Sequence, residues 1–224
     1  MPPGAMLDDM TIRREQMVAA LADEFRIRDP RVLAAMRQIP RHRFVPEALK
    51  AQAYRDGALP IASGQTISQP YIVARMTELL ELNGTETVLE IGAGTGYQTA
   101  ILATLAKKVF AIERLDGLAR EAASRLAGLG FRNVTLKTGD GSKGWSAYQP
   151  FDAILVAAGG PGVPAPLVAQ LKVGGKLVIP VGETRENQRL VRVTRTESGT
   201  RTEDFGPCVF VPLIGDHGWK ESQQ

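Results

Sequence analysis

Apolar residues in the first sixty positions recur at the three- and four-residue spacing of amphipathic helices. One helix is predicted over residues 10–25. A second is predicted to begin at Asp29-Pro30, an N-cap residue followed by a proline in the first turn, and to end at Pro40. Because these helices precede the first pattern typical of a sheet strand, residues 10–60 are expected to form an N-terminal helical cap.

From residue 85 onwards, short apolar runs alternate with helical patterns. This alternation is typical of an α/β fold with a doubly wound, mostly parallel, Rossmann-like sheet that binds ligands at the carboxyl ends of its strands. The sequence therefore predicts a cofactor-binding core over residues 85–182. The predicted strands of this core are residues 88–91, 109–112, 134–138, 151–157 and 176–181.

The pattern changes again after Gln188, where single apolar residues alternate with Arg and Thr. A glycine-bearing turn separates this stretch from a second run over residues 205–213. Such alternation predicts an antiparallel hairpin at the edge of the sheet, over residues 188–214. A length of 224 residues suffices for one α/β domain with a complete core, so the whole chain, 1–224, is expected to be one domain.

Composition narrows the class of protein. Hydrophobic residues make up 44% and charged residues 23%, as in ordinary globular proteins, and no apolar run approaches the ~18 residues that a membrane span requires. The Met1-Pro-Pro-Gly start does not suggest secretion, and the single cysteine, Cys208, excludes an internal disulfide and a cysteine-cluster metal site. We therefore expect a cytoplasmic protein that needs no metal.

The charge distribution bears on possible partners. The 27 Lys and Arg residues exceed the 24 Asp and Glu residues by only three, and they are spread along the chain. A dedicated nucleic-acid surface would concentrate them on one stretch. We therefore expect neither nucleic acid nor a membrane as a partner, and we expect a monomer.

The stretch Thr87-Val-Leu-Glu-Ile-Gly-Ala-Gly-Thr-Gly-Tyr97 joins a buried strand to three glycines at alternate positions. Glycine has no Cβ, so the backbone can turn tightly there and approach a ligand. A dinucleotide fingerprint, G-x-G-x-x-G, would need a glycine in place of Tyr97. The E-x-G-x-G-x-G form is similar to motif I of class I S-adenosylmethionine methyltransferases. Alone, it also leaves open a nucleotide site or a tight turn without a ligand.

Glu113 is a second candidate ligand-binding residue, because it ends the next predicted strand seventeen residues beyond Gly96. A carboxylate at this position can accept two hydrogen bonds from ribose hydroxyls, as in other nucleoside-binding α/β folds. The alternative is a solvated acid at the end of a strand. Asp152, at the start of a later strand, is expected to be structural and to serve a turn.

Four segments closely resemble protein-L-isoaspartate O-methyltransferases, in the same order: residues 64–70, 88–97, 138–141 and 171–182. Arg41-His-Arg-Phe-Val-Pro46 and Val211-Pro-Leu213 look like the N-terminal and C-terminal signatures of that family, so the resemblance spans roughly residues 10–219. It implies methyl transfer from S-adenosylmethionine to the free α-carboxylate of L-isoaspartyl residues in damaged proteins, the first step of their repair.

The resemblance also implies roles for individual residues. Ser68 is implied as the catalytic residue, although Ser-x-Pro could equally cap the helix predicted to begin at Pro70. Val211 and Leu213 are implied to bind the polypeptide acceptor through backbone groups. Ile214 departs from the family pattern, in which many members carry a polar residue. The implied cofactor-binding residues are Thr66, Ile67, Ser68, Glu90, Gly92, Gly94, Gly96, Glu113, Asp140 and Gly141.

The implied chemistry suits the residues of this chain. A carboxylate acceptor has an ordinary pKa of about 4 and is ionised near neutral pH, so no strong general base is required. Positioning of the acceptor against an activated methyl donor then supplies most of the catalysis. The chain accordingly has only two histidines, His42 and His217, and nothing that resembles a Ser-His-Asp triad.

Two other functions remain open at the level of sequence. One is a class I methyltransferase that acts on RNA or on a small molecule. Amino-group methylation is disfavoured, because Ala157-Ala-Gly-Gly-Pro161 stands where an N/D-P-P-Y motif would be expected. The other is a nucleotide-binding protein without catalytic turnover, which is disfavoured because the implied site residues are intact.

Overall fold

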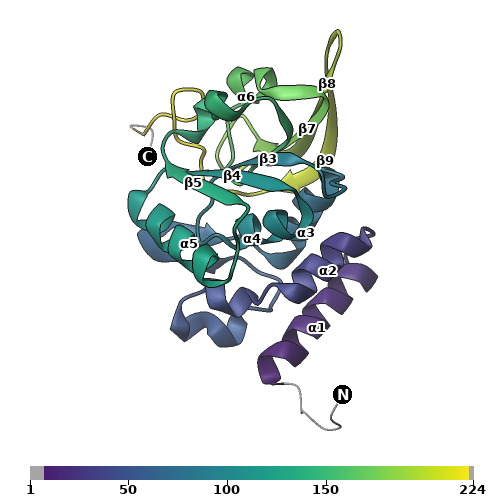
Figure 1. The fold of residues 1–224 in the computed structure, drawn as a ribbon, viewed down its shortest axis with the longest axis vertical. Helices are drawn as coiled ribbons and strands as arrows, with labels where there is room; N and C mark the ends of the chain where they lie inside the picture. Colours follow the sequence, from purple (N-terminus) through teal and green to yellow (C-terminus); the bar gives the residue numbers. More distant parts are fainter. Residues whose placement is uncertain (1–7, 222–224) are drawn as a thin grey trace.

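The computed structural model describes residues 8–221, so the Met1-Pro-Pro-Gly start lies outside the described residues. The described chain forms a seven-stranded sheet in the order β5-β4-β3-β6-β7-β8-β9 and a separate two-stranded ribbon of β1 and β2 (Figure 1). The strands are β1 (Leu59–Pro60), β2 (Thr66–Ile67), β3 (Thr87–Ile91), β4 (Lys108–Glu113), β5 (Val134–Thr138), β6 (Phe151–Val156), β7 (Leu171–Val181), β8 (Gln188–Thr196) and β9 (Gly199–Cys208).

Strands β3, β4, β5, β6 and β7 run parallel to one another, whereas β8 pairs antiparallel with β7 and forms an antiparallel hairpin with β9 at one edge. The predicted doubly wound, mostly parallel sheet with an antiparallel edge is confirmed. The chain winds outwards from β3 in both directions, through β4 on one side and β6 on the other. Connections therefore diverge at the carboxyl ends of β3 and β6, where open α/β sheets bind ligands.

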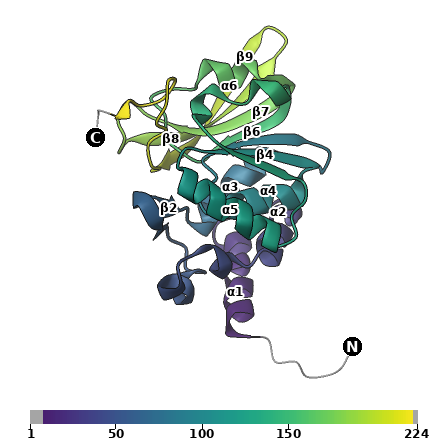
Figure 2. The same ribbon diagram turned by 60° about the vertical axis from the view of Figure 1, so that its left-hand side comes forward.

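Helices cover both faces of the sheet (Figures 1 and 2). Helices α3, α4 and α5 lie on one face, α6 lies on the other, and α1 and α2 pack outside α3 and α4. Among residues 8–221, no helix combines the length and apolar character required to cross a membrane. The helices are α1 (Asp9–Asp23), α2 (Pro30–Gln38), α3 (Pro70–Leu79), α4 (Tyr97–Leu105), α5 (Asp116–Gly128) and α6 (Ala165–Ala169).

The central strand β3 is buried from Val88 to Ile91. Successive side chains of a strand point to opposite faces of the sheet. Leu89 and Ile91 pack in the core on the α6 face, and Val88 packs in the core below α3 and α4. By this alternation, Glu90 also lies on the α3–α4 face, inside an apolar layer.

The edge hairpin differs from its predicted boundaries. Its second strand is Gly199–Cys208 rather than residues 205–213. This strand has one open edge and mostly polar side chains, such as Glu203 opposite Arg192, so it lacks the apolar alternation used to locate it. Residues beyond Cys208 leave the hairpin and run beside the end of β6.

Two further strands departed from expectation. Strand β7 begins at Leu171 rather than at residue 176, because it continues through Gly174 and Gly175, which hid its pattern. The ribbon of β1 and β2 was not predicted, since each strand has only two residues. Asp152 accepts hydrogen bonds from Thr87 N–H (2.8 Å) and Lys172 Nζ (2.6 Å). Its expected structural role is confirmed, although it ties the start of β3 rather than a turn.

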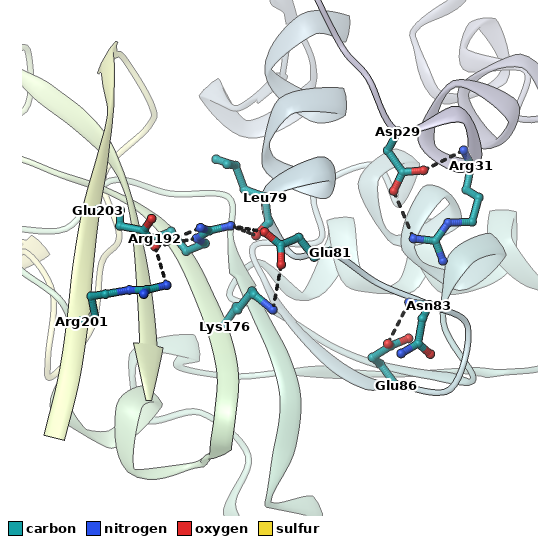
Figure 3. A network of polar contacts seen from close by, with 10 residues as sticks. All are labelled: Asp29, Arg31, Leu79, Glu81, Asn83, Glu86, Lys176, Arg192, Arg201 and Glu203. Atoms are coloured by element: carbon teal, nitrogen blue, oxygen red, sulfur yellow. Dashed lines mark hydrogen bonds and ion pairs between the residues drawn. The ribbon is translucent and has the colours of Figure 1, made fainter. Parts of the chain in front are cut away.

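An ionic network connects the C-terminal end of α3 to the hairpin (Figure 3). Arg192 of β8 contacts Glu81 (2.7 Å) through Nη1 and Glu203 of β9 (2.9 Å) through Nη2. Lys176 of β7 also contacts Glu81, at 3.2 Å. The Arg192 side chain is only 11% exposed, so this network is better shielded from solvent than an ordinary surface pair.

Glu81, which forms two of these ion pairs, has an unfavourable backbone conformation. Its φ is +53°, in the left-handed region that favours glycine after a helix. A residue with a Cβ pays about 1 kcal/mol or more to occupy this region. The two cations around the Glu81 carboxylate oppose that cost.

Two substitutions distinguish the stabilisation by the Glu81 side chain from the cost of its backbone conformation. Glu81→Ala keeps the strain and removes the ion pairs, so we expect it to lower the free energy of unfolding by about 1 kcal/mol. Glu81→Gly removes both, so it should be more stable than Glu81→Ala by about 1 kcal/mol. Urea unfolding measures both values, with Arg201→Ala as a control at the exposed end of the network. A glycine variant less stable than the alanine variant would refute the strain at Glu81.

Candidate active site

A cleft of about 300 Å³, the main cleft, lies at the carboxyl ends of β3, β4 and β6. This is the point at which the strand order diverges, so the expected location of a ligand site coincides with a cavity. The lining includes Gly64, Gln65, Thr66, Gly92, Gly94, Glu113, Leu115, Gly141, Ala157, Arg185, Val211, Leu213 and Ile214.

The turn after β3 needs its glycines for different reasons. Gly94 has φ +53° and lines the main cleft, and a Cβ there would meet no atom within 4 Å. Gly96 has φ +87°, but a Cβ there would lie 3.3 Å from Leu126 Cδ1 of α5. Gly94 thus leaves space for a ligand. Gly96 instead allows α4 and α5 to pack closely, and it is not among the residues that line the cleft.

Glu113 fastens the glycine turn from the end of β4. Its Oε2 accepts a hydrogen bond from Gly94 N–H (2.9 Å), and its Oε1 accepts one from Leu115 N–H (3.0 Å). Each carboxylate oxygen can accept a further hydrogen bond. Glu113 is 7% exposed and lines the main cleft, so it is not a solvated strand-end acid.

The Asp140 carboxylate is hydrogen-bonded to the C-terminal segment. It accepts hydrogen bonds from Ser142 N–H (2.9 Å), the Ser142 hydroxyl (2.6 Å) and Asp216 N–H (2.9 Å). Burial raises the pKa of Asp140, but these hydrogen bonds outweigh it and hold the pKa below its ordinary value. A Cβ on Gly215 would lie 2.1 Å from Asp140 Oδ1, so the segment packs directly on this carboxylate. Asp140 is not among the residues that line the main cleft, and its predicted contact with the cofactor stays a prediction.

The neighbouring Gly141 does line the main cleft. It is buried, and a Cβ there would lie 2.2 Å from Ile91 Cγ2, so no larger residue fits. Ile214, the departure from the family pattern, also lies in the lining. This part of the cleft therefore presents an apolar side chain to a ligand.

Glu90 is completely buried, and neither of its carboxylate oxygens has a hydrogen-bond partner among the described residues. Burial is the main cause that raises the pKa of Glu90; the nearby Thr99 hydroxyl lowers it and the Glu113 carboxylate raises it, and together they set the pKa at about 8. Glu90 therefore carries a proton near neutral pH. It lies beneath the glycine turn and is not among the residues that line the main cleft.

Two smaller cavities adjoin the main cleft. The inner hollow, about 40 Å³, lies between the glycine turn, α3 and Thr66–Ser68. The side cavity, about 140 Å³, lies between the start of α3 and residues 207–211. Thr66 and Ala157 line all three spaces, and Ser68 lines both smaller ones. Part of the polar stretch before α3 therefore lies where the three spaces meet.

Ser68 does not cap α3. The N-cap residue is Gln69, and no side chain caps the helix in the usual way. Asp56 instead accepts a hydrogen bond from Tyr71 N–H through Oδ1 (2.8 Å) and a longer one from Gln69 Nε2 (3.4 Å). The helix-cap alternative for Ser68 is therefore wrong, and Ser68 is among the residues that line both smaller cavities.

Val211 and Leu213 line the main cleft, but their backbones are largely committed. Val211 O accepts a hydrogen bond from Gly159 N–H, and Leu213 N–H donates to Gly159 O, both at 2.8 Å. Leu213 O accepts a further one from Trp219 N–H (2.8 Å). Leu213 N–H is therefore already paired, whereas each carbonyl oxygen can accept a second hydrogen bond, and the binding of an extended peptide by Val211 and Leu213 stays a prediction.

Several residues that line the main cleft or the side cavity were not predicted from the sequence. Leu115 and Arg185 line the main cleft, and Tyr71 and Phe210 line the side cavity. Leu115 could have been found, because it lies only two residues beyond the strand-end acid Glu113. Arg185 lies in a loop without a pattern, and only the fold brings it to the cleft.

The parallel sheet, its antiparallel edge and the glycine turn at the switch point define a class I methyltransferase fold. A sequence model of the family Protein-L-isoaspartate(D-aspartate) O-methyltransferase (PCMT) matches residues 12–218, and the chain belongs to this family. Protein-L-isoaspartate O-methyltransferase 1 of Rhodopseudomonas palustris (strain HaA2) is 56% identical over 216 residues, which are 95% of this chain and 88% of the relative. The Syntrophus aciditrophicus relative is 53% identical over 96% of this chain and 99% of its own length.

Solved structures support the same assignment. A protein-L-isoaspartate O-methyltransferase structure aligns with a TM-score of 0.83 and 26% identity, over 92% of this chain and 67% of that chain. A Plasmodium falciparum protein, crystallised with S-adenosyl-L-homocysteine, has a TM-score of 0.78 at 23% identity, over 90% of this chain and 98% of its own, and it shows the shared fold. Among residues 8–221, no three His, Cys, Asp or Glu residues form a cluster that could hold a metal.

The two roles of glycine at position 94 can be separated with a matched control. Gly94 and Gly130 both have positive φ and open space at Cβ, but only Gly94 lines the main cleft. Gly94→Ala and Gly130→Ala should therefore each lower the free energy of unfolding by about 1–2 kcal/mol. We expect only Gly94→Ala to weaken S-adenosylhomocysteine binding, by at least about tenfold, in calorimetric titrations. Equal affinity in the two variants would show that Gly94 serves the turn alone.

Glu90→Gln should change how stability depends on pH. Between the ordinary pKa of 4.5 and about 8, the folded protein keeps a proton that the unfolded chain releases, so stability falls as pH rises through this window. A neutral glutamine removes this dependence. The free energy of unfolding of Glu90→Gln, relative to wild type, should therefore increase by more than about 1 kcal/mol from pH 5 to pH 8. Urea titrations at both pH values test this, and a constant difference would mean that Glu90 is ionised when folded.

Proposed function

We propose that the main cleft binds S-adenosylmethionine and that the side cavity binds the acceptor, so that the chain methylates the free α-carboxylate of L-isoaspartyl residues in damaged proteins. The observation that carries this proposal is the meeting of the three spaces at Thr66 and Ala157. One ligand that extends from the main cleft into the inner hollow would bring its end to the side cavity. A donor and an acceptor could then meet at a single point.

The residues that line the main cleft fit this cofactor. Glu113 retains acceptor capacity for ribose hydroxyls, although both its oxygens already hold backbone amides. Leu115 and Ile214 offer apolar contacts to a base, and Gly94 leaves room for close backbone approach. S-adenosylmethionine, when bound, supplies an activated methyl group. The residues of the chain then need only hold the two reactants in line.

The acceptor side calls for orientation rather than proton transfer. The isoaspartyl α-carboxylate is ionised near neutral pH, so no base has to activate it. Neither His42, which is hydrogen-bonded to the Tyr54 hydroxyl (2.7 Å), nor His217 lines the three spaces. We assign Ser68 to the orientation of this carboxylate, because Ser68 lines both smaller cavities and its hydroxyl is not used to cap α3.

The proposal extends to the setting of the reaction. We infer that the chain acts as a monomer in the cytoplasm, on flexible polypeptide and not on nucleic acid or membranes. A polypeptide acceptor is favoured by the side cavity, one wall of which is formed by residues 207–211. Gel filtration with light scattering tests the monomer.

The decisive experiment uses methyl-labelled S-adenosylmethionine with two matched peptides, one isoaspartyl and one aspartyl at the same position. Label should enter only the isoaspartyl peptide, as a base-labile ester. Equal labelling of both peptides would contradict recognition of the isoaspartyl group. Label entering RNA but neither peptide would favour the rival class of methyltransferase.

Substitutions at Ser68 test its proposed role. Ser68→Ala should leave the melting temperature nearly unchanged, whereas Asp56→Ala should lower the free energy of unfolding by about 1 kcal/mol, because Asp56 holds the first turn of α3. Ser68→Asp places a second carboxylate beside the first and should reduce isoaspartyl methylation by at least about tenfold, or ~1.4 kcal/mol of transition-state stabilisation. Turnover of Ser68→Asp close to that of wild type would remove Ser68 from the active site.

A further inference from the structure

Gln188, the first residue of β8, has a buried side-chain amide that binds three backbone groups. Its Nε2 donates to Arg185 O (2.7 Å) and Phe210 O (3.0 Å), and its Oε1 accepts from Phe210 N–H (2.9 Å). The residue is 1% exposed and lines none of the three active-site spaces. Its contacts nevertheless lead directly to those spaces.

Phe210 is the important partner, because it lines both the inner hollow and the side cavity. The ladder between β8 and β9 ends at the pair of Gln188 and Cys208, and the chain beyond Cys208 leaves the sheet. Both backbone polar groups of Phe210 would then be buried without a strand to pair with. The amide of Gln188 replaces that strand, since it offers one donor and one acceptor, as a peptide group does.

The same side chain touches the other side of the site. Its bond to Arg185 O holds the loop between β7 and β8, from which Arg185 lines the main cleft. A Cβ on Gly159 would lie 2.4 Å from Gln188 Oε1, so the end of β6 packs directly on the amide. Gly159 in turn pairs with the backbones of Val211 and Leu213. Gln188 is therefore where three segments that surround the site are joined.

We propose that Gln188 is a positioning residue for the acceptor: it fixes the segment at residues 207–211 that forms one wall of the side cavity, opposite Ser68. This inference rests on the proposed function, because it assigns the side cavity to the isoaspartyl polypeptide. Phe210 moves if the amide is lost, and the distance across the cavity is no longer set. The donor contacts at Glu113 and Gly94 do not involve Gln188 and persist.

The chain contains a matched control for this role. Gln170 is also buried, at 5% exposure, and its amide also bridges a loop: Nε2 donates to Lys143 O (2.8 Å) and Oε1 accepts from Trp145 N–H (2.7 Å). Gly144 packs on it as Gly159 packs on Gln188, with a hypothetical Cβ 2.3 Å from Oε1. Gln170 lines none of the three spaces. The two glutamines thus share their chemistry but not their location.

The test compares Gln188→Met with Gln170→Met, which remove the amide and keep similar side-chain length. Both variants should melt at lower temperature than wild type. Only Gln188→Met should raise the KM for an isoaspartyl peptide, by at least about fivefold, and its dissociation constant for S-adenosylhomocysteine should rise by less, because Glu113 and Gly94 keep their contacts while the Arg185 loop loses one bond. A peptide KM within twofold of wild type in Gln188→Met, or an equal rise in Gln170→Met, would overturn the positioning role.

A second variant keeps the test decisive if Gln188→Met does not fold. Gln188→Asn keeps the amide on a side chain one methylene shorter, so it weakens the bonds to Phe210 without burying a charge, and it should raise the peptide KM by at least about twofold. An unchanged KM in this variant would count against the inference. Wild-type protein that fails to methylate the isoaspartyl peptide would instead refute the proposed function, so the two failures are distinguishable.

Discussion

The structure depends on the backbone turn that follows the buried strand β3. Gly92 N–H donates to Ile112 O of β4 (2.8 Å), and Ala157 N–H of the β6 end donates to Ile91 O (2.8 Å), so the turn is attached to both neighbouring strands. Glu113 then fixes Gly94 N–H from the other side. Because the strand order diverges at this point, the cleft follows from sheet topology, and the positive φ at Gly94 keeps it open.

The sequence predicted those parts of the fold whose signals are local. Pro30 and Pro70 begin α2 and α3 as expected, because proline fits the first turn of a helix. The central strands were found because parallel strands covered on both faces read as apolar runs. Strand β9 was misplaced because an edge strand with polar side chains carries no such run, and the β1–β2 ribbon is too short to show a period.

Some residues of the site were predicted from the sequence and others were not, and individual residues show the physical reasons. Gly94 and Glu113 were singled out because their chemistry is evident next to a strand end, whereas Ser68 was implied only by the family resemblance; all three line the cavities. The cap of α3 was not, since Asp56 lies fourteen residues before Pro70 and meets the helix only through the fold. Glu90 and Asp140 belong to motifs next to the cleft but are not among its lining residues: Glu90 is buried, and the Asp140 carboxylate is hydrogen-bonded to Ser142 and Asp216.

Helix α3 is held at both ends by residues outside it, and its two ends are linked to two different walls of the side cavity. Asp56 holds its first turn beside Ser68, and Glu81 ties its last turn to the hairpin that continues into residues 207–211. Because the cavity is held in this way, it keeps its shape. A protein substrate must therefore change its own conformation in order to enter it. A damaged site inside a folded region must first unfold locally, and the free energy of that opening adds to the barrier for modification. The rate at which a folded protein is methylated then reports its own local stability around the damaged residue.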